Sequence, residues 1–102
     1  MRVLVVFIDG MGLGERSPDN PFVFAETPFL TALLAGNPLT GEMGGFHDER
    51  ASLCALDAQL GVPGLPQSAT GQAALFTGVN APRHLGYHLN GFPNPPLRTL
   101  LE

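Results

Sequence analysis

The chain has 102 residues, which is enough for one small domain. Only 14% of its residues are charged, against about 25% in an average soluble protein, while 44% are hydrophobic, 13 are glycine and 10 are proline. A small domain on its own has much surface to solvate, so this composition favours an interior piece of a larger protein. The net charge of −4 implies no affinity for nucleic acids or for acidic membranes.

Cysteine content and the first apolar run bear on the cellular compartment. The single Cys54 excludes an internal disulfide, and because it lies in an apolar run it is expected to be a small buried side chain. The apolar run Val3–Ile8 stops at Asp9 and is too short for a signal peptide or a membrane span. The cytoplasm is therefore the expected location.

The first predicted element is a strand over Arg2–Ile8. Its residues are apolar on both faces and rich in β-branched side chains, as in a central strand of a parallel sheet that helices cover. The strand ends at Asp9, and the glycine-rich segment Gly10–Gly14 follows. The expected fold class is α/β, with these residues as the N-terminal part of a mostly parallel sheet and with residues 1–102 as a single portion of one catalytic domain.

Short elements are predicted up to residue 56. A loop over Glu15–Glu26 precedes a helix. Thr27 is expected to cap this helix, Pro28 lies in its first turn, and the helix ends at Ala35 before Gly36. Two short strand candidates follow, separated by a polar turn at residues 47–50; they are Leu39–Phe46 and Ala51–Leu56.

The stretch Leu65–Gly78 predicts a loop that turns into a helix, with Ser68 at the turn. Pro66 stops any helix from upstream, residues 69–76 can propagate one, and Gly78 suits the position just past its end. Ser68 has two possible roles. It can cap the helix, or its Oγ can act as a nucleophile while the first helix N–H groups stabilise negative charge.

The last part of the chain predicts a loop and a helix. Residues 80–96 are rich in proline, glycine and asparagine, and Asn94 and Pro95 then begin a helix with Leu97, Leu100 and Leu101 on one face. Two histidines in the loop, His84 and His88, have a spacing that would suit a metal on a helix, but Gly86 between them favours polar loop residues. His47, in the polar turn, is expected to face solvent.

Asp9 is the second candidate functional residue. A carboxylate at the end of a buried strand lies where open α/β sheets bind ligands, although it could also be an ordinary turn residue. The segment after it matches a dinucleotide fingerprint poorly, because Glu15 stands where the third glycine is needed. A divalent cation is the better partner for Asp9, since hard cations prefer carboxylate oxygens.

The combination of Asp9 and Ser68 indicates more than either residue alone. A cation held at a strand end beside a hydroxyl at a helix start suits metal-assisted phosphoryl transfer, because the cation lowers the hydroxyl pKa and neutralises phosphate oxygens. Thr70 is a competing nucleophile in the same stretch, but it would fall in the first helical turn. Ser68 is therefore preferred.

These two motifs, Val5–Gly12 and Gln67–Gln72, resemble the alkaline phosphatase superfamily. The branch they resemble most contains cofactor-independent phosphoglycerate mutase, phosphopentomutase and related metalloenzymes. In that branch a strand-end aspartate binds one of two divalent metal ions, and a serine or threonine in the motif Asn/Asp-Ser/Thr-x-x-Gly-His is transiently phosphorylated. The resemblance covers most of the chain from Arg2 onward.

The resemblance implies roles for individual residues. Ser68 falls on the phosphorylated position and Asp9 on a metal ligand, with Ser68 also bound to metal. Gln67 and Gln72 replace the usual Asn/Asp and His of the motif, which leaves the substrate open. Arg83 could bind a phosphate or carboxylate of the substrate, or be a solvated loop residue. The implied cofactors are two divalent metal ions (Mn, Zn or Mg), whose remaining ligands come from a much longer chain.

The resulting interpretation is the N-terminal piece of a metal-dependent phosphomutase or phosphatase with a phosphoserine intermediate on Ser68. The 102-residue chain is expected to be inactive alone and to need the remainder of the catalytic domain or a second chain, with a phosphorylated small molecule as substrate. One alternative is a small non-catalytic binding or assembly module in which Ser68 caps a helix. Another is a nucleotide-binding domain that uses the glycines after Asp9.

Overall fold

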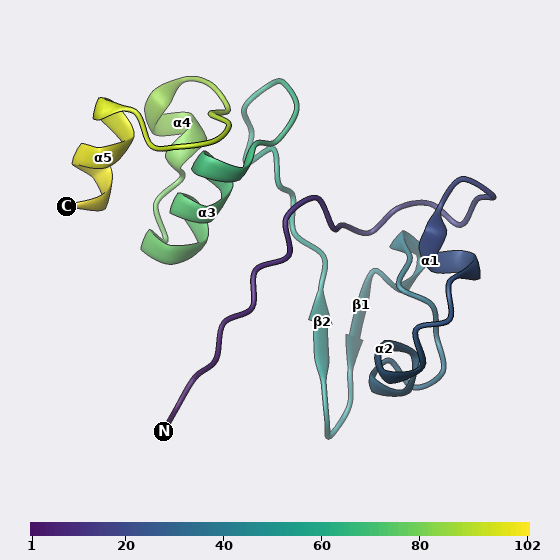
Figure 1. Ribbon diagram of the computed structural model, residues 1–102. Helices are drawn as coiled ribbons and strands as arrows, with labels where there is room; N and C mark the ends of the chain where they lie inside the picture. Colours follow the sequence, from purple (N-terminus) through teal and green to yellow (C-terminus); the bar gives the residue numbers. More distant parts are fainter. The chain divides into compact units, whose positions relative to one another are not determined.

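Proline and glycine divide the first half of the chain into short elements. The computed structural model describes residues Met1–Glu102, which form two units, Met1–Leu56 and Asp57–Glu102. In the first unit, α1 and α2 each begin at a proline, and a 3₁₀ turn and a hairpin follow (Figure 1). The elements are α1 (Pro21–Phe24), α2 (Pro28–Leu33), η1 (Gly41–Met43), β1 (Gly45–His47) and β2 (Ser52–Cys54).

Strands β1 and β2 pair antiparallel, with Phe46 opposite Leu53. Two hydrogen bonds tie the rest of the first unit together. The guanidinium of Arg50 donates to the carbonyl of Ala32 at 2.8 Å, near the end of α2, and the N–H of Gly41 donates to the carbonyl of Gly14, also at 2.8 Å. The unit buries few side chains, Leu34, Leu39 and Thr40 among them.

The predicted strand Arg2–Ile8 is not part of a sheet. It runs as an extended segment (purple in Figure 1), but the sheet contains only β1 and β2. Its apolar side chains are exposed, with Val3 at 74% and Phe7 at 40% of full exposure. A central strand needs a partner on each edge for its N–H and C=O groups, and each of the two strands present is three residues long and pairs with the other. The fold is broadly α/β, with helices and a small antiparallel sheet, and a strand buried on both faces is absent.

The second unit is helical. It contains α3 (Ser68–Thr77), α4 (Ala81–Leu85) and α5 (Pro95–Leu101), and its core is formed by Ala69, Ala73, Ala81 and Leu97. The small side chains of α3 and α4 let these helices pack closely, and Leu97 of α5 fills the centre. Gly78 ends α3 in the left-handed conformation, with φ at 73°, as the sequence predicts. Asn94 caps α5 by accepting from the N–H of Leu97.

Several local predictions are wrong. Thr27 precedes α2 but makes no capping hydrogen bond with its side chain, and the helix ends at Leu33 and not at Ala35. The predicted loops over 15–26 and 80–96 contain short helices, α1 and α4, because Asn20 and Asn80 cap them and Pro21 and Pro82 lie in their first turns. Cys54 is exposed, since it is the last residue of β2 in a sheet of two short strands whose alternate side chains face solvent. None of the helices has the length and apolar content needed to cross a bilayer.

The hairpin turn depends on the ionisation of Asp48. The carboxylate accepts hydrogen bonds from the N–H groups of Arg50 and Ala51, both at 2.8 Å. These bonds, that of Arg50 first, lower the pKa of Asp48 below its usual 3.8. A lowered pKa in the folded state stabilises the turn above the usual value, and this stabilisation is lost as the pH falls through the lowered pKa.

We therefore expect the amide proton shifts of Arg50 and Ala51 to titrate together in acid, with a midpoint below 3.8. In Asp48→Asn the same two shifts should stay flat over this range, because the amide does not ionise. Two-dimensional NMR of the labelled chain measures both variants. A midpoint at or above 3.8 would contradict the role given to these two hydrogen bonds.

Candidate functional site

Ser68 is the first residue of α3, and it does not cap the helix. Gln67 occupies the capping position, and no side chain there accepts from the first helix N–H groups. The Ser68 side chain is partly exposed, and its hydroxyl donates to Oδ1 of Asn90 at 3.3 Å. The capping role considered for Ser68 is thus absent, and its oxygen lone pairs accept no hydrogen bond from the protein. The hydroxyl is available for chemistry.

Two N–H groups in the first turn of α3 are already hydrogen-bonded to a backbone carbonyl. The N–H groups of Ala69 and Thr70 both donate to the carbonyl oxygen of Leu89, at 3.1 and 3.3 Å. These are the groups expected from the sequence to stabilise negative charge on a ligand. That expectation is wrong for this structure, because Leu89 already satisfies both donors.

Thr70 is excluded as the competing nucleophile. Its side chain is fully buried, and its hydroxyl donates to the carbonyl of Gln67 at 3.3 Å and accepts from the N–H of Leu89 at 3.2 Å. A hydroxyl that is buried and bonded on both sides cannot reach a substrate. Thr70 holds the loop that contains Leu89 onto α3, and of the two candidate nucleophiles only Ser68 is partly exposed.

Asp9 lies in a turn at the end of the extended N-terminal segment. Its side chain is exposed and makes no hydrogen bond or ion pair, and Gly10 after it has φ of 72°, which a residue with a side chain rarely adopts. Asp9 belongs to the unit Met1–Leu56 and Ser68 to the unit Asp57–Glu102. Neither unit by itself contains the predicted pair.

The metal-ligating side chains do not gather in one place. The structure has no group of three or more His, Cys, Asp or Glu residues that could hold a metal ion. A single carboxylate and a serine hydroxyl fall short of the six or more oxygen ligands that Mg²⁺ or Ca²⁺ take, and of the four donors of a zinc site. The residues present therefore do not fit a two-metal centre by themselves.

Neither the histidines nor Arg83 form a hydrogen bond with Ser68. His84 is exposed near the end of α4, whereas His88 follows Gly86 and its Nε2 lies 3.0 Å from the carbonyl oxygen of Val62. The two histidines thus do not lie on one helix. His88 is a loop residue as expected, whereas His84 lies on α4, contrary to the prediction. Nδ1 of His47, on β1, lies 2.7 Å from Oγ of Ser52. Arg83 is exposed on α4, and its guanidinium makes no bond within the protein.

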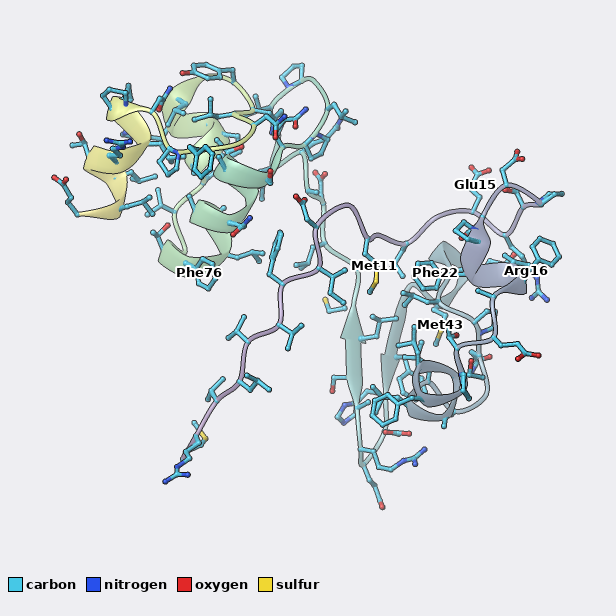
Figure 2. The ribbon with its side chains drawn as sticks, in the orientation of Figure 1. Met11, Glu15, Arg16, Phe22, Met43 and Phe76 are labelled. Carbon is cyan, nitrogen blue, oxygen red and sulfur yellow. The ribbon has the colours of Figure 1, made fainter.

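A pocket of about 250 Å³ lies in the first unit, and neither Asp9 nor Ser68 is among its lining residues. Its rim carries an ion pair between Arg16 and Glu42 at 3.8 Å, both largely exposed; Arg16 lies beside Glu15 in the loop that leads to α1 (Figure 2). The pocket is lined by Arg16, Asn37, Pro38, Thr40, Glu42 and Met43. Because Asp9 is absent from this lining, the pocket is not the site that the sequence predicts.

The sequence analysis missed Leu89 and Asn90, which both contact the start of α3. Asn90 precedes Gly91, and such a pair predicts only a turn. Its contact with Ser68 spans 22 residues, so no local pattern could have shown it. Comparison of the chain with protein-family models, with curated proteins and with solved structures finds no match.

Proposed function

We propose that this chain contributes the phosphoryl-accepting serine and one metal-binding aspartate to a metal-dependent phosphomutase or phosphatase. The observation that carries the proposal is the state of Ser68. It stands at the first position of a ten-residue helix, partly exposed, with a hydroxyl whose lone pairs are free. The capping position belongs to Gln67, so Ser68 makes no capping bond and its side chain is bonded only to Asn90.

The proposed parent enzyme belongs to the alkaline phosphatase superfamily, near cofactor-independent phosphoglycerate mutase and phosphopentomutase. Its core is a mostly parallel sheet in which Arg2–Ile8 is one strand, which would account for the exposed apolar side chains of that segment. The two divalent ions (Mn, Zn or Mg) need ligands besides Asp9 and Ser68, and these come from the remainder of the catalytic domain or from a second chain. The proposed location is the cytoplasm.

In this proposal Ser68 Oγ forms a bond to phosphorus while the bond from phosphorus to the leaving oxygen of a phosphorylated small molecule breaks. The helix N–H groups of Ala69 and Thr70 take no part, since Leu89 occupies them. Arg83 is the basic side chain of the second unit that we assign to the substrate, because its guanidinium is exposed and unpaired.

The test is phosphoryl labelling of the protein encoded by the whole open reading frame, with ³²P-labelled phosphate ester and Mn²⁺. We expect label on Ser68 and none in Ser68→Ala. The matched control is Thr77→Ala, which removes a hydroxyl from the other end of α3 and should keep the label. The 102-residue chain alone should take up no label.

Label that persists in Ser68→Ala would refute the serine's role. A reading frame that stops after codon 102, with a chain that gains no label, would favour the alternative of a non-catalytic binding or assembly module. The observation that favours this alternative is the exposure of large apolar side chains in the second unit, which a protein partner would cover; they include Leu65, Leu75, Phe76 and Phe92. The ring of Phe76 points away from α4 and α5 (Figure 2).

A further inference from the structure

The side-chain oxygen of Asn90 receives two hydrogen bonds. The N–H of Gly91 donates to it at 2.7 Å, and the hydroxyl of Ser68 lies 3.3 Å away. A backbone N–H can only donate, so the atom facing Gly91 must be the amide oxygen and not the amide nitrogen. This fixes the orientation of the Asn90 side chain, and the Ser68 hydroxyl must point its proton at the same oxygen.

The backbone beside Asn90 is held firmly on the start of α3. Leu89 accepts from the N–H groups of Ala69 and Thr70 and donates its own N–H to Oγ1 of Thr70. Three hydrogen bonds thus fix the residue before Asn90 relative to the first turn that carries Ser68. This docking keeps Asn90 within hydrogen-bond distance of Ser68, at 3.3 Å, and no other side chain bonds to the Ser68 hydroxyl.

We propose that Asn90 is the positioning residue for the Ser68 hydroxyl. Its amide oxygen accepts a hydrogen bond from the Ser68 hydroxyl. This bond turns the lone pairs of Oγ outward, toward the group that Ser68 attacks. An amide oxygen is too weakly basic to remove the proton, so Asn90 orients the nucleophile without acting as a general base. The inference rests on the proposed function for the role of Ser68 and adds a residue that controls its reactivity.

The experiment measures the labelling rate of Ser68 in the full 102-residue chain by diisopropyl fluorophosphate, at several pH values. In this reaction the Oγ–P bond forms, the P–F bond breaks, fluoride leaves and the hydroxyl proton goes to water. Intact mass and peptide mapping give the rate at Ser68. The variants are Asn90→Ala and Asn90→Asp, with Asn94→Ala as control, because Asn94 also accepts a backbone N–H in this unit but does not contact Ser68.

We expect Asn90→Ala to slow labelling of Ser68 by about 2- to 10-fold, which corresponds to the net free energy of one hydrogen bond. Asn90→Asp places a carboxylate where the amide oxygen was and should accelerate labelling at least about tenfold, because a positioned carboxylate can accept the proton. This gain should appear as the carboxylate ionises, near pH 4, and the native chain should show no such step. Asn94→Ala should label as the native chain does.

Equal rates and equal pH profiles in the native chain and both Asn90 variants would overturn the proposal. So would the same change of rate in Asn94→Ala, since that would mean a general loss of structure. The readout uses neither metal nor substrate. If phosphoryl labelling fails while Asn90→Asp gains its pH step, the proposed function is wrong and the positioning by Asn90 stands.

Discussion

Leu97→Ala should lower the free energy of unfolding of the second unit by about 2–5 kcal/mol. Leu97 is fully buried and lies among Ala69, Ala73 and Ala81, whose short side chains cannot move in to fill the space. The variant loses the transfer free energy of the side chain and leaves a cavity as well. A unit this small has a total stability of similar size, at roughly 0.05–0.15 kcal/mol per residue, so much of it should be unfolded without denaturant.

A natural probe makes this measurement specific to the second unit. The chain has one tyrosine and no tryptophan, and the tyrosine is Tyr87, whose hydroxyl accepts from Nδ2 of Asn94 at 2.7 Å. Tyrosine fluorescence during urea titration therefore follows the residues around α4 and α5. Leu101→Ala is the control, since Leu101 lies on the same helix but is 46% exposed, and it should shift the midpoint far less. An unchanged midpoint in Leu97→Ala would mean that α5 is not part of this core.

The helices that the sequence predicts correctly are those with strong local end signals. For α5 the capping asparagine, the proline after it and the apolar face of Leu97 and Leu100 all lie within seven residues, and the structure has this helix. For α3 the boundaries differ by one residue at each end from the predicted 69–76, because Gly78 is a clear stop. The two missed helices are four and five residues long and too short for periodicity to show.

The strand Arg2–Ile8 shows what local signals cannot supply. The amino-acid composition of this segment indicates only that its residues suit burial on both faces of a sheet. Burial also requires neighbouring strands, and pairing partners are non-local, so the pattern of one segment cannot reveal whether they are present. The two short strand candidates and the polar turn between them are local features, and β1 and β2 lie at or within these segments. Their antiparallel pairing was not predicted. Asp48 stabilises the turn through a bond that spans three residues.

The candidate site was predictable in part. The place of Ser68 at the start of α3 follows from Pro66, the apolar run and Gly78. The choice between Ser68 and Thr70 could only be argued from position, whereas the structure decides it through the burial of Thr70. The blocked N–H groups of α3 were missed because the acceptor, Leu89, belongs to a loop about twenty residues away, as the 19-residue span of its bond to Thr70 shows.

Thr70→Val should destabilise the second unit by about 1–3 kcal/mol and loosen the loop that carries Asn90. Valine has nearly the shape of threonine, so packing at this fully buried position is kept. The hydroxyl, however, is the acceptor for the N–H of Leu89, and without it that donor has no partner. The effect should reach the hydroxyl of Ser68, since Leu89 holds Asn90 in place.

Two measurements on Thr70→Val check this. The urea midpoint from Tyr87 fluorescence should fall, and amide hydrogen exchange at Leu89 should accelerate more than exchange in α5. The matched control is Thr99→Val, which removes a hydroxyl that donates to the carbonyl of Pro95 on an exposed helix face and should stay within about 0.5 kcal/mol of the native chain. If Leu89 exchanges at its native rate in Thr70→Val, the loop is held by the carbonyl of Leu89 alone, and Thr70 has no part in placing Asn90 beside Ser68.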